Sequence, residues 1–167
     1  ALRWPSSLGG PLDAYLVVPA LMLLVGFTGS AFGFRGTPRD DERPGPACYC
    51  GRTGCIETFL SGPGLSATYA ALANQQAEAA DIAARAESGD ARAAKALDLY
   101  EGRLARALAS IINVLDPDVI VLGGGLSNIG RLYTNVPALW QSFVFSDSTD
   151  TPLVPARYGD SSGVRGA

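Results

Sequence analysis

Histidine is absent from this 167-residue sequence, and with it the commonest general base and the commonest neutral metal ligand of proteins. A site that needs a histidine is therefore incomplete in this chain or completed by a second chain. Charged residues are also few, at 17%, and a net charge of -3 with a pI near 4.8 provides no basic surface for a polyanion. We therefore expect no nucleic-acid partner.

Cysteine is scarce as well, because the sequence has only Cys48, Cys50 and Cys55. Three clustered thiols do not make a disulfide framework, and they suit the reducing cytoplasm better than secretion. Gly51 and Gly54 let the backbone turn tightly enough to aim several thiolates at one metal ion. Zinc takes four ligands in a tetrahedron, so one ligand is missing from the pattern. One disulfide with a free thiol, or three reduced cysteines that bind nothing, would explain the same spacing.

The first 36 residues differ in composition from the rest of the chain, because charged residues are few among them. An uncharged run from Ala14 to Phe34 is long enough to cross a bilayer, which needs about 20 residues. Pro19 and three glycines interrupt the run, so a membrane span is the less favoured interpretation. The alternatives are buried core segments at residues 16–18 and 21–25, or a segment foreign to a domain that comprises residues 37–167.

Prolines, glycines and charges divide the next part of the chain into short elements. We expect an exposed loop from Thr37 to Ala47, because three prolines and a charge cluster disfavour both helix and strand. A short helix should follow the cysteines and end at Gly62-Pro63. Two more helices are predicted over residues 65–73 and 76–88.

The clearest predicted element is a long amphipathic helix that begins at an N-cap residue, Asp90, and ends near Asp116-Pro117. Its apolar residues recur at helical spacing along one face. These predicted core residues are Leu97, Leu104, Leu108, Ile111 and Leu115.

A short run of β-branched residues, Asp118 to Leu122, follows the long helix and is typical of a buried parallel strand. A glycine triplet comes next, then two helical candidates at residues 126–132 and 136–145, and a last strand at residues 153–156. This order of elements indicates an α/β fold. A hydrophobic content of 47% supports a globular body, and the length suits one domain.

The sequence CYCGRTGCIE, from Cys48 to Glu57, resembles the C-x-C-G-x-x-G-C-x-E signature of the ROK family of sugar kinases and sugar-responsive repressors. IINVLDPDVIVLGGGLSN at residues 111–128 and YGDSSGVRGA at residues 158–167 agree with the same family. Together with ETFLSGPG at residues 57–64, these motifs look most like the fructokinase or mannokinase branch. The resemblance implies the C-terminal part of a ribonuclease H-like, actin/hexokinase-type α/β sugar kinase domain with a cysteine knuckle.

The resemblance also implies roles for individual residues. Cys48, Cys50 and Cys55 would be three of four structural zinc ligands, and Glu57 would accept hydrogen bonds from sugar hydroxyls. The triplet Gly123, Gly124 and Gly125 would form the turn under the nucleotide. The family's substrates would be a hexose such as fructose and Mg-ATP. From the residues alone, Glu57 could equally be a glutamate at a helix N-terminus, and the triplet a plain strand-to-helix turn.

The sequence departs from the family pattern in two places. Neither the glycine-rich phosphate loop nor the catalytic aspartate of the N-terminal half is matched, so we assign no catalytic residue and expect a truncated chain that is inactive alone. The family's Glu-x-Gly-His segment has its nearest counterpart at Ala31-Phe32-Gly33-Phe34. A zinc ligand would then be phenylalanine, and water, another residue or a second chain would complete the site.

Two other interpretations remain open. The chain could be a zinc-binding structural or interaction module, or the remnant of a ROK sugar-responsive regulator. The regulator is disfavoured because the charge is acidic and no helix-turn-helix precedes the domain. A membrane-tethered domain is a third, weaker alternative. The sequence leaves open both the hexose and the oligomeric state, with a homo-oligomer among the alternatives.

Overall fold

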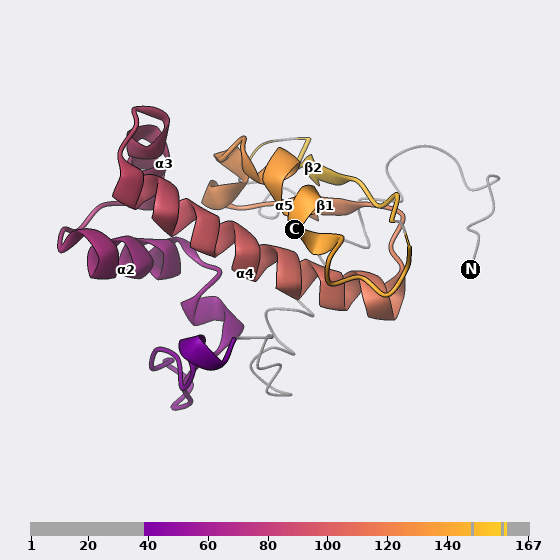
Figure 1. The fold of residues 1–167 in the computed structure, drawn as a ribbon, viewed down its shortest axis with the longest axis horizontal. Coiled ribbons are helices and arrows are strands. Elements are labelled where there is room, and N and C mark those ends of the chain that lie inside the picture. Colours follow the sequence, from indigo (N-terminus) through magenta and orange to yellow (C-terminus); the bar gives the residue numbers. More distant parts are fainter. Residues whose placement is uncertain (1–38, 148, 158, 160–167) are drawn as a thin grey trace.

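The computed structural model describes residues 39–147, 149–157 and 159 (Figure 1). The hydrophobic run at residues 14–34, the predicted domain boundary at residue 37 and most of the motif at residues 158–167 lie outside these described residues. Within them, no helix combines the length and the hydrophobicity that a membrane span requires.

Helix α4, Ala91–Leu115, is the longest element of the described region and crosses it lengthwise (Figure 1). The side chain of Asp90 accepts hydrogen bonds from the backbone N–H groups of Arg92 and Ala93, which confirms the predicted N-cap. The helix ends at Asp116, which adopts a left-handed conformation with φ of 44°. Helix α4 contacts three other helices: α2 (Gly62–Ala73), α3 (Ala79–Glu87) and α5 (Leu132–Trp140).

The apolar face of α4 forms the centre of the hydrophobic core. Leu97, Leu104 and Leu108 are buried there, as the helical spacing predicts. Ile111 is half-buried and packs against this core, but the prediction is wrong for Leu115, which is 52% exposed, and it omits Ile112, which is buried. A straight helix drifts by about 20° per seven residues against a heptad repeat, so its buried face moves to a different set of residues after three turns.

Strands β1 (Ile120–Leu122) and β2 (Leu153–Pro155) pair in parallel, with Ile120 opposite Leu153 and Leu122 opposite Pro155. Both strands were predicted, and the three residues of β1 are all buried, as expected of a strand flanked by helices. Helix α5 lies between the two strands in the chain and also contacts β2. The described region therefore contains a β-α-β unit next to α4, as an α/β fold requires.

The Gly62-Pro63 pair begins helix α2 instead of ending the preceding one, so this prediction is wrong. The side chain of Ser61 caps α2 by accepting a hydrogen bond from the backbone N–H of Gly64. Proline is favoured in the first turn of a helix because its missing N–H has no partner there. The residues before it form a single 3-10 turn, η2, Ile56–Thr58.

One other prediction is wrong at the level of element type. Residues 126–132 were expected to be helical, but a 3-10 turn, η3 (Gly125–Asn128), occupies their first part and α5 starts only at Leu132. The exposed loop expected from Thr37 to Ala47 is confirmed over its described residues, 39–47, which contain only a short 3-10 turn, η1 (Asp40–Glu42). Within that turn Glu42 turns inward, and its side chain is only 10% exposed.

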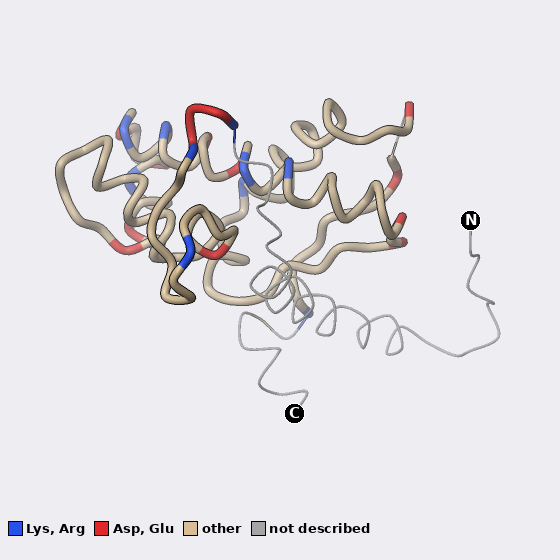
Figure 2. The backbone as a smooth tube through the Cα atoms, turned by 90° about the horizontal axis from the view of Figure 1, so that it is seen from below, with Lys and Arg blue, Asp and Glu red and all other residues tan. Residues whose placement is uncertain are grey.

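Acidic and basic residues are interspersed along the described chain. Figure 2, which views the molecule from below, shows Lys and Arg positions interspersed with Asp and Glu positions. Several of these charges are paired with each other, including Arg131 with Asp98 and Arg103 with Glu42. The charge pattern of the described region is therefore mixed in sign.

Replacing Leu97 by alanine should lower the free energy of unfolding by about 2–5 kcal/mol, because a fully buried leucine leaves a cavity in the core. Leu115→Ala on the same helix is the matched control, and we expect it to cost less than about 1 kcal/mol because that side chain is half exposed. Urea unfolding followed by circular dichroism measures both. Equal losses for the two variants would contradict the assignment of the core.

Replacing Gly64 by alanine should also destabilise the fold, by about 1–3 kcal/mol. A Cβ atom at Gly64 would lie 2.7 Å from the carbonyl oxygen of Thr58 and 2.9 Å from the carbonyl carbon of Phe59. Gly62→Ala in the same helical turn is the control, because a Cβ atom there meets no atom within 4 Å. Thermal unfolding should show a lower Tm for Gly64→Ala and an unchanged or higher Tm for Gly62→Ala.

Candidate functional site

The three cysteines lie in a tight loop, the cysteine knuckle, which comprises residues 47–55. An antiparallel bridge joins Ala47 to Thr53, and the backbone N–H of Cys48 donates to the carbonyl of Arg52 at 2.8 Å. Gly51 turns the chain with φ of 81°, a conformation that glycine adopts without strain. This turn brings the three cysteine sulfur atoms within 4.8 Å of one another.

The spacing of these sulfur atoms fits a single metal ion. Ligands about 2.3 Å from a tetrahedral zinc ion lie about 3.8 Å from each other. The Sγ atoms of Cys50 and Cys55 are 3.5 Å apart. Cys48 and Cys55 are buried while Cys50 is exposed, so the cluster is open on one side. Among the described residues the cluster has three ligand side chains. Ala31 and Phe34, the nearest counterparts of the family's Glu and His, lie outside the described residues.

The protein environment separates the pKa values of two of the thiols. A hydrogen bond from the backbone N–H of Arg52 lowers the pKa of Cys50, and neighbouring thiols lower it further. The hydrogen bond with Cys50, together with burial, raises the pKa of Cys55 to about 11. Of these two thiols Cys50 therefore ionises first, and its thiolate then accepts a hydrogen bond from the S–H group of Cys55.

Two glycines allow the chain that enters the knuckle to touch the chain that leaves it. Gly45 and Gly54 both have positive φ, and a Cβ atom on Gly45 would lie 2.5 Å from the Cα atom of Gly54. The backbone N–H of Gly54 donates to the carbonyl of Pro46 at 2.8 Å. The base of the knuckle is thus closed by backbone contacts that side chains would prevent.

Glu57 lies in η2, immediately after the knuckle, and faces a pocket of about 230 Å³. The hydroxyl of Thr58 donates to the carbonyl of Cys55 at 2.6 Å, which fixes η2 against the last cysteine. Gly123 lines the same pocket, together with apolar residues of α4 and β1. The structure therefore brings together two residues that the sequence analysis assigned to different substrates.

Tyr100 also lines this pocket, and the sequence analysis missed it. Burial and the negative charge of Glu57 both raise the pKa of Tyr100 well above its usual range, so its hydroxyl keeps its proton. A tyrosine three residues after Leu97 and four before Leu104 lies on the buried face of α4, and this spacing was the signal that could have found it.

The glycine triplet forms an ordered turn after β1. Gly124 has φ of 80°, and both the backbone N–H and the hydroxyl of Ser127 donate to its carbonyl, at 2.9 and 2.7 Å. Gly123 and Gly125 are exposed and would have room for a side chain. Of the three, Gly124 is thus the position whose backbone conformation requires glycine.

An ion pair between the buried Glu101 and the partly exposed Arg131 fixes the start of the helix that follows this turn. Glu101 of α4 accepts hydrogen bonds from the guanidinium of Arg131, and from the side-chain amide of Asn135 at 3.0 Å. Tyr133, between these two residues, donates its hydroxyl proton to the carbonyl of Ser127 at 2.6 Å. The start of α5 is therefore tied both to α4 and to the turn that carries the glycines.

Comparison with known sequences adds three findings. The sequence model of the ROK family matches residues 25–167. An N-acetyl-D-glucosamine kinase of Aliivibrio salmonicida is 38% identical over 127 residues, which are 76% of this chain and 42% of that protein. The corresponding kinase of Pasteurella multocida is 41% identical over 128 residues, again 76% and 42%. The chain thus spans about two fifths of the length of these relatives.

Two crystal structures share the fold. A ROK hexokinase from Thermus thermophilus has a TM-score of 0.63 and 27% identity, over 73% of this chain and 41% of the other. A ROK glucokinase from Streptomyces griseus, in complex with glucose and AMPPNP, has a TM-score of 0.64 and 22% identity, over 73% and 46%. The described region is therefore part of an actin/hexokinase-type α/β domain. The matching motifs and the shared fold establish that this chain belongs to the ROK family.

Proposed function

We propose that this chain forms the sugar- and nucleotide-facing C-terminal part of an ATP-dependent hexose kinase, which transfers a phosphoryl group to the sugar 6-hydroxyl. The observation that carries the proposal is the shared pocket, which Glu57 and Gly123 both line. The names of its relatives, which are sugar kinases, support the same reaction class. Fructose is the first hexose to test because of the motif at residues 57–64, and N-acetylglucosamine is the second because of the relatives.

Each side of the pocket would have a separate task. The Glu57 carboxylate has lone pairs for two or more sugar hydroxyls, and a hydrogen bond to an ionised group is stronger than one to a neutral group. The turn at Gly123, Gly124 and Gly125 would let backbone N–H groups approach the nucleotide. Mg-ATP supplies the phosphoryl group. We assign no catalytic residue, because the sequence matches neither the family's aspartate base nor its phosphate loop, and we expect no turnover by this chain alone.

Glu57→Gln should weaken hexose binding at least about tenfold, because a charge-assisted hydrogen bond contributes about 1.5–3 kcal/mol. Saturation-transfer NMR titrations with fructose, N-acetylglucosamine and glucose measure the affinity and identify the preferred sugar. Glu87→Gln is the matched control, because Glu87 is exposed on α3, outside the pocket.

Two results would count against this proposal. Equal hexose affinity of the wild type and the Glu57→Gln variant would remove Glu57 from the sugar site. Formation of ADP from Mg-ATP and a hexose by the purified chain would show that the assumed lack of catalytic machinery is wrong.

We also propose that Cys48, Cys50 and Cys55 hold one structural zinc ion. Their sulfur atoms lie close enough together to bind it. Thiolates bind zinc in preference to magnesium or calcium, which take oxygen ligands. The ion would link the two arms of the knuckle and add its binding energy to folding. The same knuckle favours the alternative function, a zinc-stabilised interaction module. Free thiols of this kind agree with a cytoplasmic location.

The purified chain should bind about one equivalent of Co²⁺, with the intense absorption of thiolate-to-metal charge transfer, and Zn²⁺ should displace it. A chelator should lower the Tm of the wild type but leave the Tm of a Cys48→Ser/Cys55→Ser variant unchanged. Mg²⁺ serves as the control metal and should not change the Tm of either protein. A wild-type protein that binds neither metal would refute the zinc site.

A further inference from the structure

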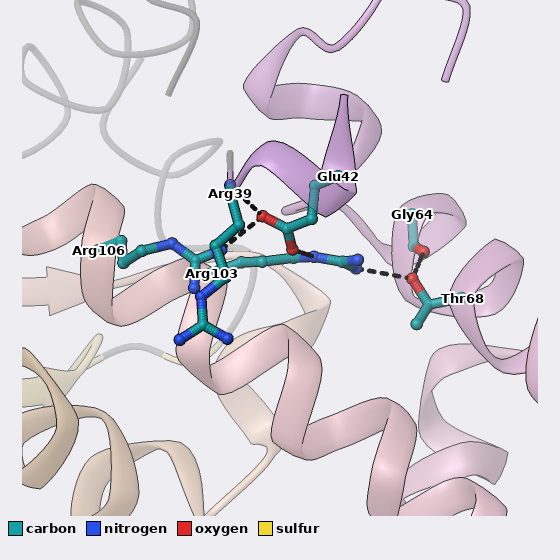
Figure 3. Close-up of polar contacts among 6 residues, drawn as sticks. All are labelled: Arg39, Glu42, Gly64, Thr68, Arg103 and Arg106. Atoms are coloured by element: carbon teal, nitrogen blue, oxygen red, sulfur yellow. Dashed lines mark hydrogen bonds and ion pairs between the residues drawn. The ribbon is translucent and has the colours of Figure 1, made fainter. Parts of the chain in front are cut away.

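Glu42, at the end of η1, is a buried carboxylate outside the pocket. Its Oε1 atom accepts a hydrogen bond from Nε of Arg103 at 2.6 Å, and its Oε2 atom accepts one from Nη2 of Arg106 at 2.7 Å. The backbone N–H of Arg39 donates to Oε2 at 2.8 Å. Figure 3 shows the carboxylate between the two arginines, which both come from α4. The sequence analysis placed Glu42 in an exposed loop and gave it no role.

Arg103 makes two further contacts with its guanidinium group. The group stacks over the ring of Phe59, 4.9 Å from the ring centroid. Its Nη1 atom donates to the hydroxyl oxygen of Thr68 on α2 at 3.0 Å, and that hydroxyl donates to the carbonyl of Gly64 at 2.9 Å (Figure 3). One side chain of α4 therefore contacts η1, α2 and the residue that follows η2.

Two partners of Arg103 lie on opposite sides of the three cysteines in the sequence. Glu42 precedes the first cysteine by six residues, and Phe59 follows the last cysteine by four. Arg103 therefore holds both ends of one loop, residues 42–59, which contains the knuckle and Glu57. A Cβ atom on Gly45 would lie 3.1 Å from the Phe59 ring, so the ring also packs against the chain that enters the knuckle.

We propose that Glu42, Arg103, Arg106 and Phe59 form a clip that positions the knuckle, so that its cysteines are held ready for a metal ion before the ion binds. Closing a loop at its base removes conformations that metal binding would otherwise have to remove. A site that is ordered in advance loses less entropy on binding, and its affinity rises accordingly. The proposal rests on the zinc site proposed above. The clip residues are positioning residues because none of them supplies a ligand atom to the cluster.

The electrostatics of the clip favour a positioning role over a general stabilising one. Burial alone would raise the pKa of Glu42, but the hydrogen bond from Arg103, the backbone N–H of Arg39 and the charge of Arg106 hold it below its ordinary value. The group is thus a carboxylate with two cationic partners. Buried ion pairs add little net stability compared with apolar residues, but removal of one partner leaves an uncompensated charge, so we expect these contacts to favour one arrangement of the loop.

The first test measures metal affinity. Glu42→Gln and Arg103→Met should each weaken Co²⁺ binding about tenfold, the effect typical of residues that orient metal ligands, and should change the shape of the cobalt absorption spectrum. Arg92→Met is the matched control on α4, because Arg92 is exposed and its side chain is outside the clip. Leu97→Ala is a second control, which lowers global stability without touching the clip and should keep wild-type cobalt affinity in the folded protein.

The second test needs no metal. Cys48 and Cys55 are buried in the knuckle, whereas Cys50 is exposed. In metal-free protein, loss of the clip should speed the alkylation of the two buried thiols by iodoacetamide by about tenfold or more, because the loop opens more often. The exposed thiol should react at its wild-type rate, and the Arg92→Met control should match the wild type at all three.

The two tests separate the proposals. If the wild type binds no Co²⁺, the zinc site is wrong, and the thiol reaction rates still decide whether the clip positions the knuckle. If Co²⁺ binds but the clip variants bind it as tightly as the wild type, the clip has no positioning role toward metal. Unchanged affinity together with unchanged thiol reactivity would overturn the clip altogether.

Discussion

The burial of one face of helix α4 is the constraint on which the described structure depends. Elements that precede it in the chain, α2 and α3, and one that follows it, α5, all contact this helix. The same helix provides the wall of the pocket through Tyr100 and Leu104. A change that moved α4 would therefore disturb the core and the candidate sugar site together.

Two buried carboxylate clusters extend from α4 in nearly opposite directions. Glu101 binds the arginine that starts α5, and Arg103 binds the carboxylate of η1. Two residues correspond to about 200° around a helix, so neighbouring side chains of this kind face opposite sides. One cluster supports the glycine turn and the other supports the cysteine knuckle. The two halves of the candidate site are thus both fixed to α4.

The local signals in the sequence were sufficient for the elements with strong periodicity. The N-cap at Asp90, the long helix and the two parallel strands were all predicted from caps, spacing and β-branched residues. The motif at Cys48 also led to the correct family. These features depend on short-range pattern, which a single sequence contains in full.

The features that the sequence analysis missed depend on contacts between distant residues. Glu42 and Arg103 are 61 residues apart, and no periodic pattern relates a charge in a proline-rich loop to one on a helix. Gly62-Pro63 was misassigned for another reason, since the same dipeptide can end one helix or begin the next, and the cap from Ser61 decided the outcome. A tertiary partner decided the structure at Glu42, whereas a local cap decided it at Gly62-Pro63.

The pairing of β2 determines at which edge the small sheet can bind a further strand. Residues 152 and 156 form backbone hydrogen bonds with β1. Because backbone groups point to alternate edges along a strand, those of Pro155 point to the opposite edge of the sheet. Proline has no N–H group to donate there. A strand could therefore join β2 only with a missing hydrogen bond, as is common for proline at the outer edge of a sheet. The backbone of Val121 points away from β2, and among the residues described no strand pairs with it. This β-sheet can be extended without such a defect on the side of β1, whose residues also line the pocket.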